Sequence, residues 1–568
     1  MAAASNGHAI GRMREPGTEA RAGRFPGPSL IPGLTAIQRE HGWLPREELV
    51  AFGREMRRPL YEIEGLISFY PHFRTDPPRA IKLEVCHDLT CWLRGGDERI
   101  AALRERYDDD VDVELVEVSC LGRCDIAPAA AIDERPIPAA AAPTLLEEAR
   151  EGSAPPAEAR PGKGPRPNDP YAPGDERYRV LRRALAGEMA PEEIIAALTD
   201  SGLRGMGGAG FPTGRKWELV AGQTATPKYA ICNADESEPG TFKDRQILAE
   251  QPHLVLEGLL LGMLVTGADA GWVFIRHEYG PEEHIVVGEI AQLRAAGLIG
   301  DDAGGSGRRL EIDVFTSPGG YILGEESALI ECMEGHRGEP RNKPPFPGVS
   351  GLWGQPTLMN SVETFADVPV IVERGAEWWR EQGVNGGTGL KFFAVSGHVE
   401  TPDVYCVPMG TTARELIDLA GGVLHGAPLA AIQPGGASSN FLGPDQLDVP
   451  LDFEPVAEAG SMLGSGAVVV VAEGTDLLAA ATNVLRFFRN ESCGKCVPCR
   501  VGSHKAHTIL VDLLEQGLGA DAVDERIIEL EETMRMTSIC GLGQVALGPV
   551  TSVLGLQRGG TAARPHPR

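Results

Sequence analysis

One group of cysteines has the spacing of an iron–sulfur site. In the stretch SCGKCVPC, two residues separate Cys493 from Cys496 and Cys496 from Cys499. This is the compact arrangement that surrounds one face of a [4Fe–4S] cube. The later stretch TSICGLGQ supplies Cys540 as a fourth ligand. Because backbone N–H groups in glycine-rich loops can donate to the sulfides, we expect a [4Fe–4S] cluster here, with zinc as the alternative.

A second group consists of Cys86, Cys91, Cys120 and Cys124. The first two form C-x4-C after one predicted strand, and the last two form C-x3-C after the next. Two neighbouring strand ends could bring four sulfurs together. Structural zinc usually has a C-x2-C knuckle in each half, whereas longer spacings suit a [2Fe–2S] cluster, whose two irons separate the ligand pairs. We favour the cluster; zinc and unligated thiols are the alternatives.

A glycine-rich stretch, GLRGMGGAGFPTGRKW (202–217), is a candidate phosphate cradle. Backbone N–H groups that carry no side chain beside them can approach an anion closely, and Lys216 adds a positive charge. The order differs from G-x-x-x-x-G-K-[ST], so a P-loop is not expected. The alternative interpretation is a tight surface turn.

The strand KYAICNADESEPGTFKDR (228–245) places Asn233, Asp235, Glu236 and Glu238 at its carboxyl end, where α/β folds bind ligands. Carboxylates there would repel phosphate, but they can accept hydrogen bonds from ribose hydroxyls or a flavin N–H. A free ribose 2′-hydroxyl distinguishes NAD from NADP. The alternative is a solvated acidic loop.

Two further stretches extend this pattern. PGGYILGEESALIE (318–331) combines a glycine turn with Glu325 and Glu326 at a predicted helix start. KPPFP presents Phe346 on a proline-stiffened loop, where it could stack on a base; the alternative is a core aromatic.

The elements that position these residues divide the chain into several parts. We expect a disordered arm over 1–28, or less favourably a transit peptide, and a helical plus α/β domain over 29–150. A proline-rich linker follows at 151–175. A larger α/β domain is predicted over 176–386, a small β-rich domain over 387–475, a helical domain over 476–557 and a tail over 558–568.

Composition excludes some functions. The 568 residues carry a formal net charge of -27, which disfavours binding to nucleic acid or anionic membranes. No apolar run reaches the ~18 residues of a membrane span. The best candidate, residues 254–268, contains Glu257 and predicts a buried helix. Without a secretion signal, we expect a cytoplasmic protein that does not insert into the membrane, with cysteines that serve as ligands.

Together these motifs resemble a known family. Residues 176–556 are similar to the NADH-binding, FMN-bearing subunit of respiratory complex I and related diaphorases. The motifs that carry the resemblance are GLRGMGGAGFPTGRKW, CNADESEPGTFKDR, GYILGEESALIE, KPPFP, TLMNSVET, SCGKCVPCR and SICGLG. Residues 29–148 resemble the thioredoxin-like [2Fe–2S] subunit of the same machinery. The resemblance implies a multidomain α/β fold with thioredoxin-like, Rossmann-like and β-grasp (SLBB) domains and a C-terminal helical bundle that holds an Fe–S cluster.

The resemblance also implies site residues. The expected FMN site consists of Gly205, Gly207, Lys216, Asn233, Asp235, Glu236, Gly324, Asn360 and Thr364. The expected NAD(H) site consists of Phe211, Glu238, Glu326 and Phe346. Three positions depart from the family pattern: Met206 stands where arginine is common, Leu219 replaces an aromatic residue, and Ser361 replaces the second asparagine of a pair.

The implied function is hydride exchange between NAD(H) and FMN, with single electrons passing between FMN and the clusters and no side chain acting as a general acid. Fusion of both parts in one chain resembles the beta subunit of soluble NAD-dependent formate dehydrogenases, whose partner is an Fe–S-containing molybdenum or tungsten alpha subunit. The alternatives are a complex I NADH dehydrogenase subunit and the diaphorase subunit of a NAD-reducing hydrogenase. A non-catalytic, zinc-stabilised scaffold is the competing interpretation from another class.

Overall fold

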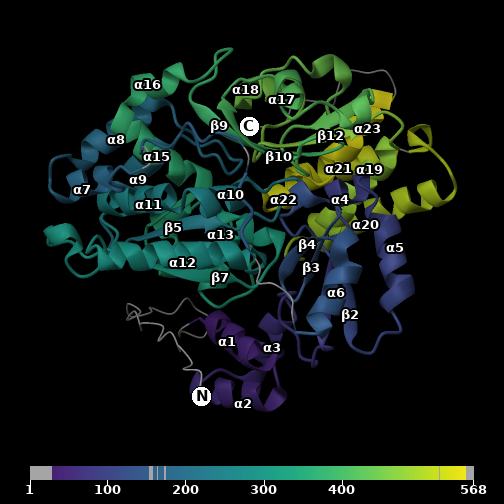
Figure 1. The fold of residues 1–568 in the computed structure, drawn as a ribbon, viewed down its shortest axis with the longest axis horizontal. Helices are drawn as coiled ribbons and strands as arrows, with labels where there is room; N and C mark the ends of the chain where they lie inside the picture. The colour runs from purple at the N-terminus through teal and green to yellow at the C-terminus, as the bar shows by residue number, and fades with distance from the viewer. Residues whose placement is uncertain (1–28, 153–157, 163, 172–173, 524, 558–568) are drawn as a thin grey trace.

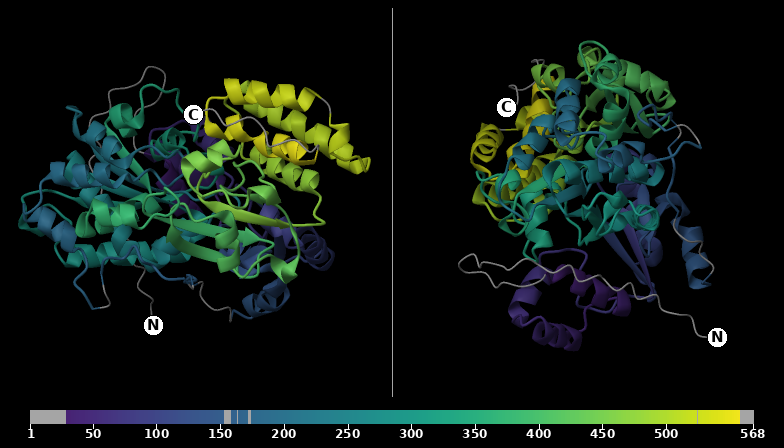
Figure 2. Two further views of the ribbon diagram at one scale, coloured as in Figure 1. Left: turned by 90° about the horizontal axis from the view of Figure 1, so that it is seen from above. Right: turned by 90° about the vertical axis from the view of Figure 1, so that its left-hand side faces the viewer.

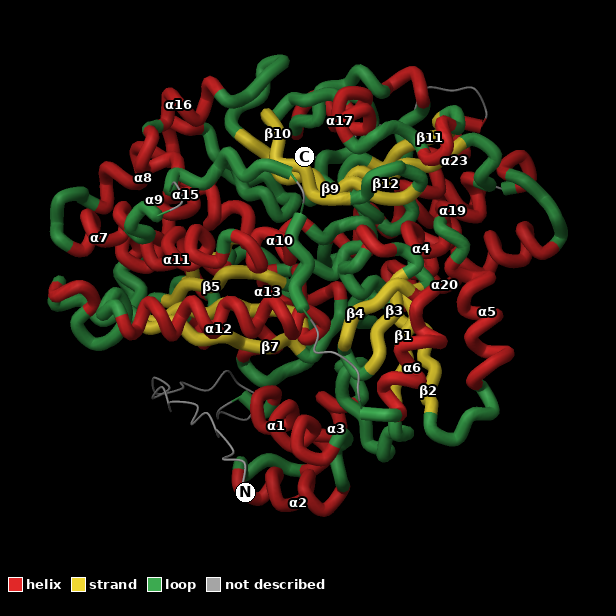
Figure 3. The backbone as a smooth tube through the Cα atoms, viewed as in Figure 1, coloured by secondary structure: helices red, strands yellow, loops and turns green. Residues whose placement is uncertain are grey.

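Three separate four-stranded sheets, with helices around them, make up the computed structural model (Figure 3). It describes residues 29–152, 158–162, 164–171, 174–523 and 525–557. The predicted N-terminal arm and C-terminal tail lie outside the described residues. The ribbon views show the helical N-terminal part beside the large α/β domain and the C-terminal helices packed on the opposite side (Figures 1 and 2).

The N-terminal part is a helical unit followed by a thioredoxin-like domain. Its sheet has the order β2-β1-β3-β4, with β1 parallel to β2 and antiparallel to β3. The two strands predicted to precede the cysteine pairs are confirmed as β1 and β2. The elements are α1 (Ile31–His41), α2 (Arg46–Glu55), α3 (Leu60–Ile67), β1 (Ile81–Cys86), α4 (Leu89–Leu93), α5 (Gly96–Tyr107), β2 (Val113–Val118), η1 (Cys124–Ile126), β3 (Ala129–Ile132), β4 (Arg135–Pro138), η2 (Ala139–Ala141) and α6 (Ala142–Arg150).

The large α/β domain is built on a parallel sheet of order β7-β6-β5-β8. Its central strands are apolar along most of their length because helices cover both faces. The elements are α7 (Arg179–Leu185), α8 (Pro191–Ser201), α9 (Thr213–Ala221), β5 (Tyr229–Ala234), α10 (Lys243–Glu250), α11 (Pro252–Thr266), β6 (Ala270–Arg276), η3 (His277–Tyr279), α12 (Gly280–Ala295), η4 (Ala303–Gly305), β7 (Glu311–Ser317), η5 (Tyr321–Gly324), α13 (Glu326–Met333), α14 (Pro347–Ser350), η6 (Leu352–Gly354), β8 (Thr357–Ser361), α15 (Val362–Arg374) and α16 (Ala376–Glu381).

Helix α11 is the buried helix predicted for residues 254–268. All but one of its residues are buried, including Glu257, whose carboxylate accepts hydrogen bonds from the Tyr171 hydroxyl at 2.7 Å and the Leu181 N–H at 3.0 Å. A Cβ on Gly258 would lie 2.0 Å from the carbonyl oxygen of Phe365 in α15. The missing side chain therefore allows these two helices to pack backbone to backbone.

The last two units are a β-grasp domain and a helical bundle. The β-grasp sheet has the order β10-β9-β12-β11, in which β9 and β12 are parallel and the outer pairs are antiparallel. The elements are β9 (Leu390–Gly397), β10 (Asp403–Pro408), α17 (Ala413–Leu419), η7 (Leu424–Gly426), β11 (Leu429–Gln433), η8 (Pro444–Gln446), α18 (Phe453–Glu458), β12 (Ala467–Ala472), α19 (Leu477–Asn490), α20 (Val497–Glu515), η9 (Ala520–Ala522), α21 (Glu525–Thr537), α22 (Gly541–Val545) and α23 (Gly548–Gln557).

Part of the predicted linker packs against the large domain. The Arg166 guanidinium donates to both carboxylate oxygens of Glu250 at 2.6 and 3.2 Å. Asn168 is fully buried and accepts from Gln251 at 3.1 Å. The proline-rich composition predicts a flexible linker. In the part of the linker that the structure describes, however, these contacts fix the chain to the surface of the large domain.

Among the described residues, no single helix has the length and apolar character needed to cross a membrane. Helices α10 and α11 meet the criterion only as a pair, and the chain bends by 95° between them.

Candidate functional site

The glycine-rich loop lies on the start of α15. The Met206 N–H donates to the Thr364 hydroxyl at 2.9 Å, and the hydroxyls of Ser361 and Thr364 are 2.8 Å apart. A Cβ on Gly207 would come within 3.1 Å of the Ser361 Cβ, so a side chain there would push the loop away. The loop therefore packs directly on the N-terminal turn of α15, a position in which backbone N–H groups can bind phosphate.

Lys216 and Asn360 meet at the edge of this cradle. The Lys216 ammonium donates to the Met359 carbonyl at 3.0 Å, and the Trp217 indole N–H donates to the Asn360 side-chain oxygen at 3.0 Å. Burial lowers the pKa of Lys216 from its ordinary value. A phosphate beside this lysine would compensate the cost of its buried charge.

The end of β5 contributes polar side chains to the same region. The Asn233 amide donates to the Gly324 carbonyl at 2.9 Å, which brings the two predicted FMN residues into contact. Burial raises the pKa of Asp235 to about 7. The Ser237 hydroxyl donates to one Asp235 oxygen, and the other is buried without a hydrogen-bond partner among the described residues. An unpartnered buried carboxylate oxygen fits a ligand that brings hydroxyl or N–H donors.

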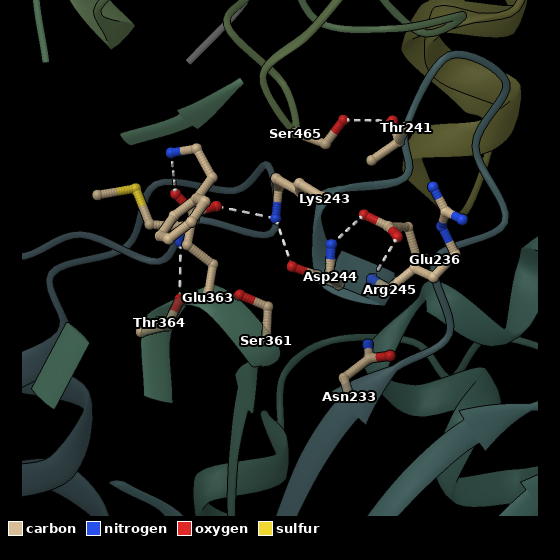
Figure 4. A network of polar contacts seen from close by, with 12 residues as sticks. Asn233, Glu236, Thr241, Lys243, Asp244, Arg245, Ser361, Glu363, Thr364 and Ser465 are labelled. Atoms are coloured by element: carbon tan, nitrogen blue, oxygen red, sulfur yellow. Dashed lines mark hydrogen bonds and ion pairs between the residues drawn. The ribbon is translucent and has the colours of Figure 1, made fainter. Parts of the chain in front are cut away.

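Glu236 has a different environment. Its carboxylate accepts from the N–H groups of Asp244 and Arg245, at 2.8 and 3.1 Å, at the start of α10 (Figure 4). It also accepts from the Tyr279 hydroxyl at 3.0 Å. Burial raises its pKa to about 7. This side chain therefore fixes the backbone after β5, and its direct contact with FMN stays a prediction.

Buried ion pairs, which the sequence analysis did not predict, attach the β-grasp domain to the cradle. Glu363, next to Thr364, accepts from the ammonium groups of Lys243 at 2.8 Å and Lys391 of β9 at 2.7 Å (Lys243 and Glu363 in Figure 4). All three side chains are fully buried. Removal of one partner from such a triad strongly destabilises the fold, because a buried charge is left unpaired. The ion pairs therefore couple the β-grasp domain to the position of α15.

The two aromatic residues predicted for the NAD(H) site are exposed. Phe211 and Phe346 are 38% and 57% exposed, which excludes the core-aromatic alternative for Phe346. Leu219 and Val349 are 51% and 53% exposed, and their helices α9 and α14 are in contact. Exposed apolar side chains of this kind mark a binding surface.

The two predicted NAD(H) carboxylates differ in their partners. Glu326 forms an ion pair with Lys343 at 2.7 Å. Glu238 is enclosed by the β-grasp loop, where the Ser438 N–H donates to its carboxylate at 2.7 Å, and burial raises its pKa to about 7.

The four N-terminal cysteines come together in the thioredoxin-like domain. The sulfurs of Cys120 and Cys124 are 3.7 Å apart, and the Cys86 thiol interacts with those of Cys120 and Cys91. Hydrogen bonding among the thiols, followed by burial, raises the pKa values of Cys86 and Cys124. Buried thiolates in such a group need metal charge to balance them, so the donor set fits a [2Fe–2S] cluster.

The four C-terminal cysteines, Cys493, Cys496, Cys499 and Cys540, line one pocket. Cys496 precedes α20 and Cys540 precedes α22, so backbone N–H groups at the helix starts are free to face the sulfurs. The Ser492 hydroxyl lies 3.2 Å from the Cys499 sulfur. A Cβ on Gly543 would lie 2.8 Å from the Cys499 Cβ, so only glycine permits this close approach. Four thiols around one pocket fit a [4Fe–4S] cube.

Arg276, which none of the sequence motifs indicated, connects the two predicted redox sites. It ends β6, the neighbour of β5, and donates to the carbonyls of Glu236 and Cys120. A charged residue that closes the apolar strand AGWVFIR is the sequence signal that could have indicated it.

A glycine-rich loop on a helix start, a polar strand end and two groups of four cysteines are together typical of an electron-transferring flavoprotein of the iron–sulfur class. Family models agree with this class and with the order of the domains. They match a thioredoxin-like [2Fe–2S] ferredoxin over residues 24–147, the Nuo51 FMN-binding domain over 198–370, an SLBB domain over 392–439 and the NADH-ubiquinone oxidoreductase-F iron–sulfur binding region over 479–558.

Individual relatives cover most of the chain. The F subunit of NADH-quinone oxidoreductase in Mycobacterium tuberculosis (strain ATCC 25618 / H37Rv) is 42% identical over 379 residues, which are 66% of this chain and 84% of the relative. The HndC subunit of the NADP-reducing hydrogenase in Solidesulfovibrio fructosivorans is 42% identical over 66% of this chain and 76% of its own. A chain in the crystal structure of an air-oxidized NAD+-reducing [NiFe]-hydrogenase is 32% identical, covers 94% of this chain and 93% of its own, and superposes with a TM-score of 0.82.

The chain belongs to the family of the NADH-quinone oxidoreductase F subunits, here fused to a thioredoxin-like [2Fe–2S] domain. It is a diaphorase-type oxidoreductase subunit whose cofactors are FMN, a [2Fe–2S] cluster and a [4Fe–4S] cluster, with NADH as substrate. The predicted fold class and cofactors are confirmed.

Proposed function

We propose that this chain exchanges electrons between NAD(H) and a partner subunit through the residues described above. Bound FMN supplies the conversion between two-electron hydride transfer and one-electron transfer. The residues of the chain itself bind and orient FMN and NAD(H). Gly205, Gly207, Lys216 and Thr364 hold the phosphate, and Asn233, Asp235, Glu236, Gly324 and Asn360 hold the rest of the flavin.

The four residues predicted for the NAD(H) site bind the dinucleotide and align it with the flavin. Phe211 and Phe346 provide apolar faces for the dinucleotide, and Glu238 and Glu326 accept hydrogen bonds from its polar groups. The reacting carbon of the nicotinamide must be held against the flavin, so alignment is the main contribution of these residues to the rate. No side chain needs to act as an acid or base.

One observation carries the electron path. The short helix η5 has Gly324, which contacts Asn233, at one end, and Ile322 of the same helix lines the C-terminal cysteine pocket. A single turn of chain therefore separates the proposed FMN site from the proposed [4Fe–4S] ligands Cys493, Cys496, Cys499 and Cys540. On the other side, Cys86, Cys91, Cys120 and Cys124 are the proposed [2Fe–2S] ligands.

Electrons must then leave through a partner. Val497 and Val501 lie one turn apart on the exposed face of α20, in the helix that also carries the buried Cys499, and are 70% and 55% exposed. Met536 and Ile539 precede Cys540 and are 70% and 37% exposed. We call these four residues the exit patch. Its apolar character beside the cysteine pocket supports docking of a redox subunit there.

For the parent complex, we propose a soluble NAD-dependent formate dehydrogenase in which a molybdenum or tungsten alpha subunit oxidises formate. The fusion of both parts in one chain supports this assignment. A second candidate, the diaphorase subunit of a NAD+-reducing hydrogenase, is supported by the full-length likeness to such a chain. A complex I subunit is supported by the relatives named as F subunits of NADH-quinone oxidoreductase.

Purification of the native complex tests these assignments. The preparation is analysed for molybdenum, tungsten and nickel, and NAD+ reduction is measured with formate and with hydrogen. Formate-dependent reduction with molybdenum or tungsten supports the proposal, whereas hydrogen-dependent reduction with nickel supports the second candidate. A chain that, after anaerobic reconstitution, contains no FMN and shows no NADH-dependent bleaching contradicts the diaphorase function itself.

A further inference from the structure

Arg276 is a buried cation, 2% exposed, placed between two predicted redox sites. Its strand β6 pairs with β5 in parallel, with Ile275 opposite Ala234, so Arg276 emerges beside the polar strand end. The guanidinium donates to the Glu236 carbonyl at 2.6 Å and to the Cys120 carbonyl at 2.7 Å. One rigid group therefore contacts both the flavin side and a proposed cluster ligand.

Two further donors of Arg276 are used by one carboxylate. Its Nε and Nη2 donate to the two oxygens of Glu278 at 2.9 and 2.6 Å. Arg276 and Glu278 therefore form a bidentate ion pair in which Arg276 is buried and Glu278 is partly buried.

The surrounding chain leaves Arg276 and the cysteine loop little freedom. The guanidinium lies 5.1 Å from the Tyr279 ring centre. A Cβ on Gly122, in the loop between Cys120 and Cys124, would lie 2.3 Å from the Tyr279 hydroxyl oxygen. The Gly122 N–H also points at the Cys120 sulfur, at 3.4 Å. A shift of Arg276 is therefore transmitted to Cys120.

We propose that Arg276 is a positioning residue that raises the reduction potential of the [2Fe–2S] cluster and fixes the Cys120 loop relative to the flavin-side strand. The proposal rests on the assignment of Cys120 as a cluster ligand under the proposed function. A reduced cluster carries one more negative charge, and a buried cation that touches a ligand's carbonyl favours that state in a low-dielectric site. Glu278 must act in the opposite direction, because its negative charge disfavours the added electron.

The experiment is a redox titration of the reconstituted full-length chain, followed by the electron paramagnetic resonance signal of the reduced [2Fe–2S] cluster. At the potential where the wild-type cluster is half reduced, we expect the reduced-to-oxidised ratio to fall at least tenfold in Arg276→Met, a shift of about 59 mV for one electron. Arg276→Lys, which keeps the charge, should stay within threefold of wild type. Glu278→Gln should raise the ratio.

Arg123→Met is the matched control. Arg123 anchors the same loop through a buried bidentate ion pair with Glu282, at 2.9 Å for both bonds, and this ion pair involves no carbonyl of a proposed ligand. We expect Arg123→Met to lower the melting temperature as Arg276→Met does. The ratio of reduced to oxidised cluster in Arg123→Met should stay within threefold of wild type.

An unchanged potential in Arg276→Met, an equal shift in Arg123→Met, or a fall of the ratio in Glu278→Gln would overturn the proposal. The opposite signs expected for the arginine and glutamate variants separate charge from loop loosening. If Arg276→Met does not fold, Arg276→Lys and Glu278→Gln still decide the question. Absence of any [2Fe–2S] signal in the wild-type chain would instead count against the proposed function.

Discussion

At the residue scale, buried carboxylic acids dominate the candidate site. Burial raises the pKa values of Asp235, Glu236 and Glu238 to about 7 each. Ionisation of all three buried carboxyl groups has a high free-energy cost unless hydrogen-bond donors surround them. The site is therefore prepared for a ligand rich in hydroxyl and N–H groups, and its affinity should depend on pH near neutrality.

Glu238→Gln tests this pH dependence. Below pH 7 the Glu238 carboxyl is largely protonated, and above pH 7 it becomes a charged acceptor, so the wild-type KM for NADH should fall as pH rises through about 7. The variant should show a KM about tenfold higher above pH 7, equivalent to ~1.4 kcal/mol for one charged hydrogen bond, and a flat profile. Steady-state NADH oxidation with ferricyanide between about pH 6 and pH 8.5, a range that brackets this transition, measures both.

The exposed Glu192 on α8 provides the control for this prediction, because Glu192→Gln should leave the profile unchanged. A KM that stays at the wild-type value in Glu238→Gln and in Glu238→Ala would show that Glu238 does not belong to the NAD(H) site.

Glu257→Gln separates burial from function, because Glu257 lies in α11 and outside the predicted site. Burial raises its pKa to about 7 from an ordinary 4.5, so the folded chain binds a proton that the unfolded chain releases. The unfolding free energy should therefore fall by about 3 kcal/mol as pH rises from about 4.5 through 7. Glutamine keeps one acceptor oxygen for the Leu181 N–H, and its NH2 group can donate to the Tyr171 hydroxyl, so the variant removes this loss.

Thermal unfolding followed by circular dichroism at about pH 5 and about pH 8, on either side of the raised pKa, measures the effect of Glu257→Gln. The melting temperatures of the two proteins should be similar at the lower pH, and the variant should be the more stable at the higher pH. A constant difference between the proteins at both pH values would contradict the assignment.

At the element scale, the contact between α11 and α15 sets the position of the phosphate cradle, because α15 carries Thr364 near its start. Gly258→Ala would force the Phe365 carbonyl away, since its Cβ would lie 2.0 Å from that oxygen. We expect a loss of about 2–3 kcal/mol in unfolding free energy, the scale of overpacking, and weaker FMN retention. Urea unfolding and flavin fluorescence after gel filtration measure the two effects.

Gly288→Ala on α12 is the matched control for this element. Among the described residues, nothing lies within 4 Å of the Cβ that it would add, so alanine should stabilise the helix by about 1 kcal/mol. Equal destabilisation by both alanine variants would show that the α11–α15 contact has no special role.

Elements with strong local patterns could be predicted from the sequence. The predicted strand that is observed as β5 is an apolar run, and the length and apolar character of residues 254–268 indicate the buried helix α11. The contacts between distant segments could not be predicted. The bond from Ser438 to Glu238 joins residues 200 positions apart, and Arg276 reaches back 156 positions to Cys120. No local periodicity encodes such pairs, because tertiary packing alone brings them together.

At the scale of the whole molecule, the two cysteine sites have different surroundings. Cys86, Cys91, Cys120 and Cys124 are buried at the junction of the thioredoxin-like and α/β domains, whereas three of the four C-terminal cysteines are partly exposed beside the exit patch. An electron can therefore reach a partner more directly from the C-terminal site. We propose that the N-terminal site stores an electron beside the main path.

Val501→Glu tests this separation of roles. The change places a charge in the exit patch, on the exposed face of α20, and should weaken binding of the redox partner at least tenfold, because a desolvated unpaired charge at an apolar interface costs more than ~1.4 kcal/mol. FMN content and NADH oxidation with ferricyanide should match wild type. Val111→Glu, at an 81% exposed position between α5 and β2, is the control and should affect neither. Co-purification of the native partner measures binding, and a Val501→Glu chain that retains its partner as tightly as wild type would place the electron exit elsewhere on the molecule.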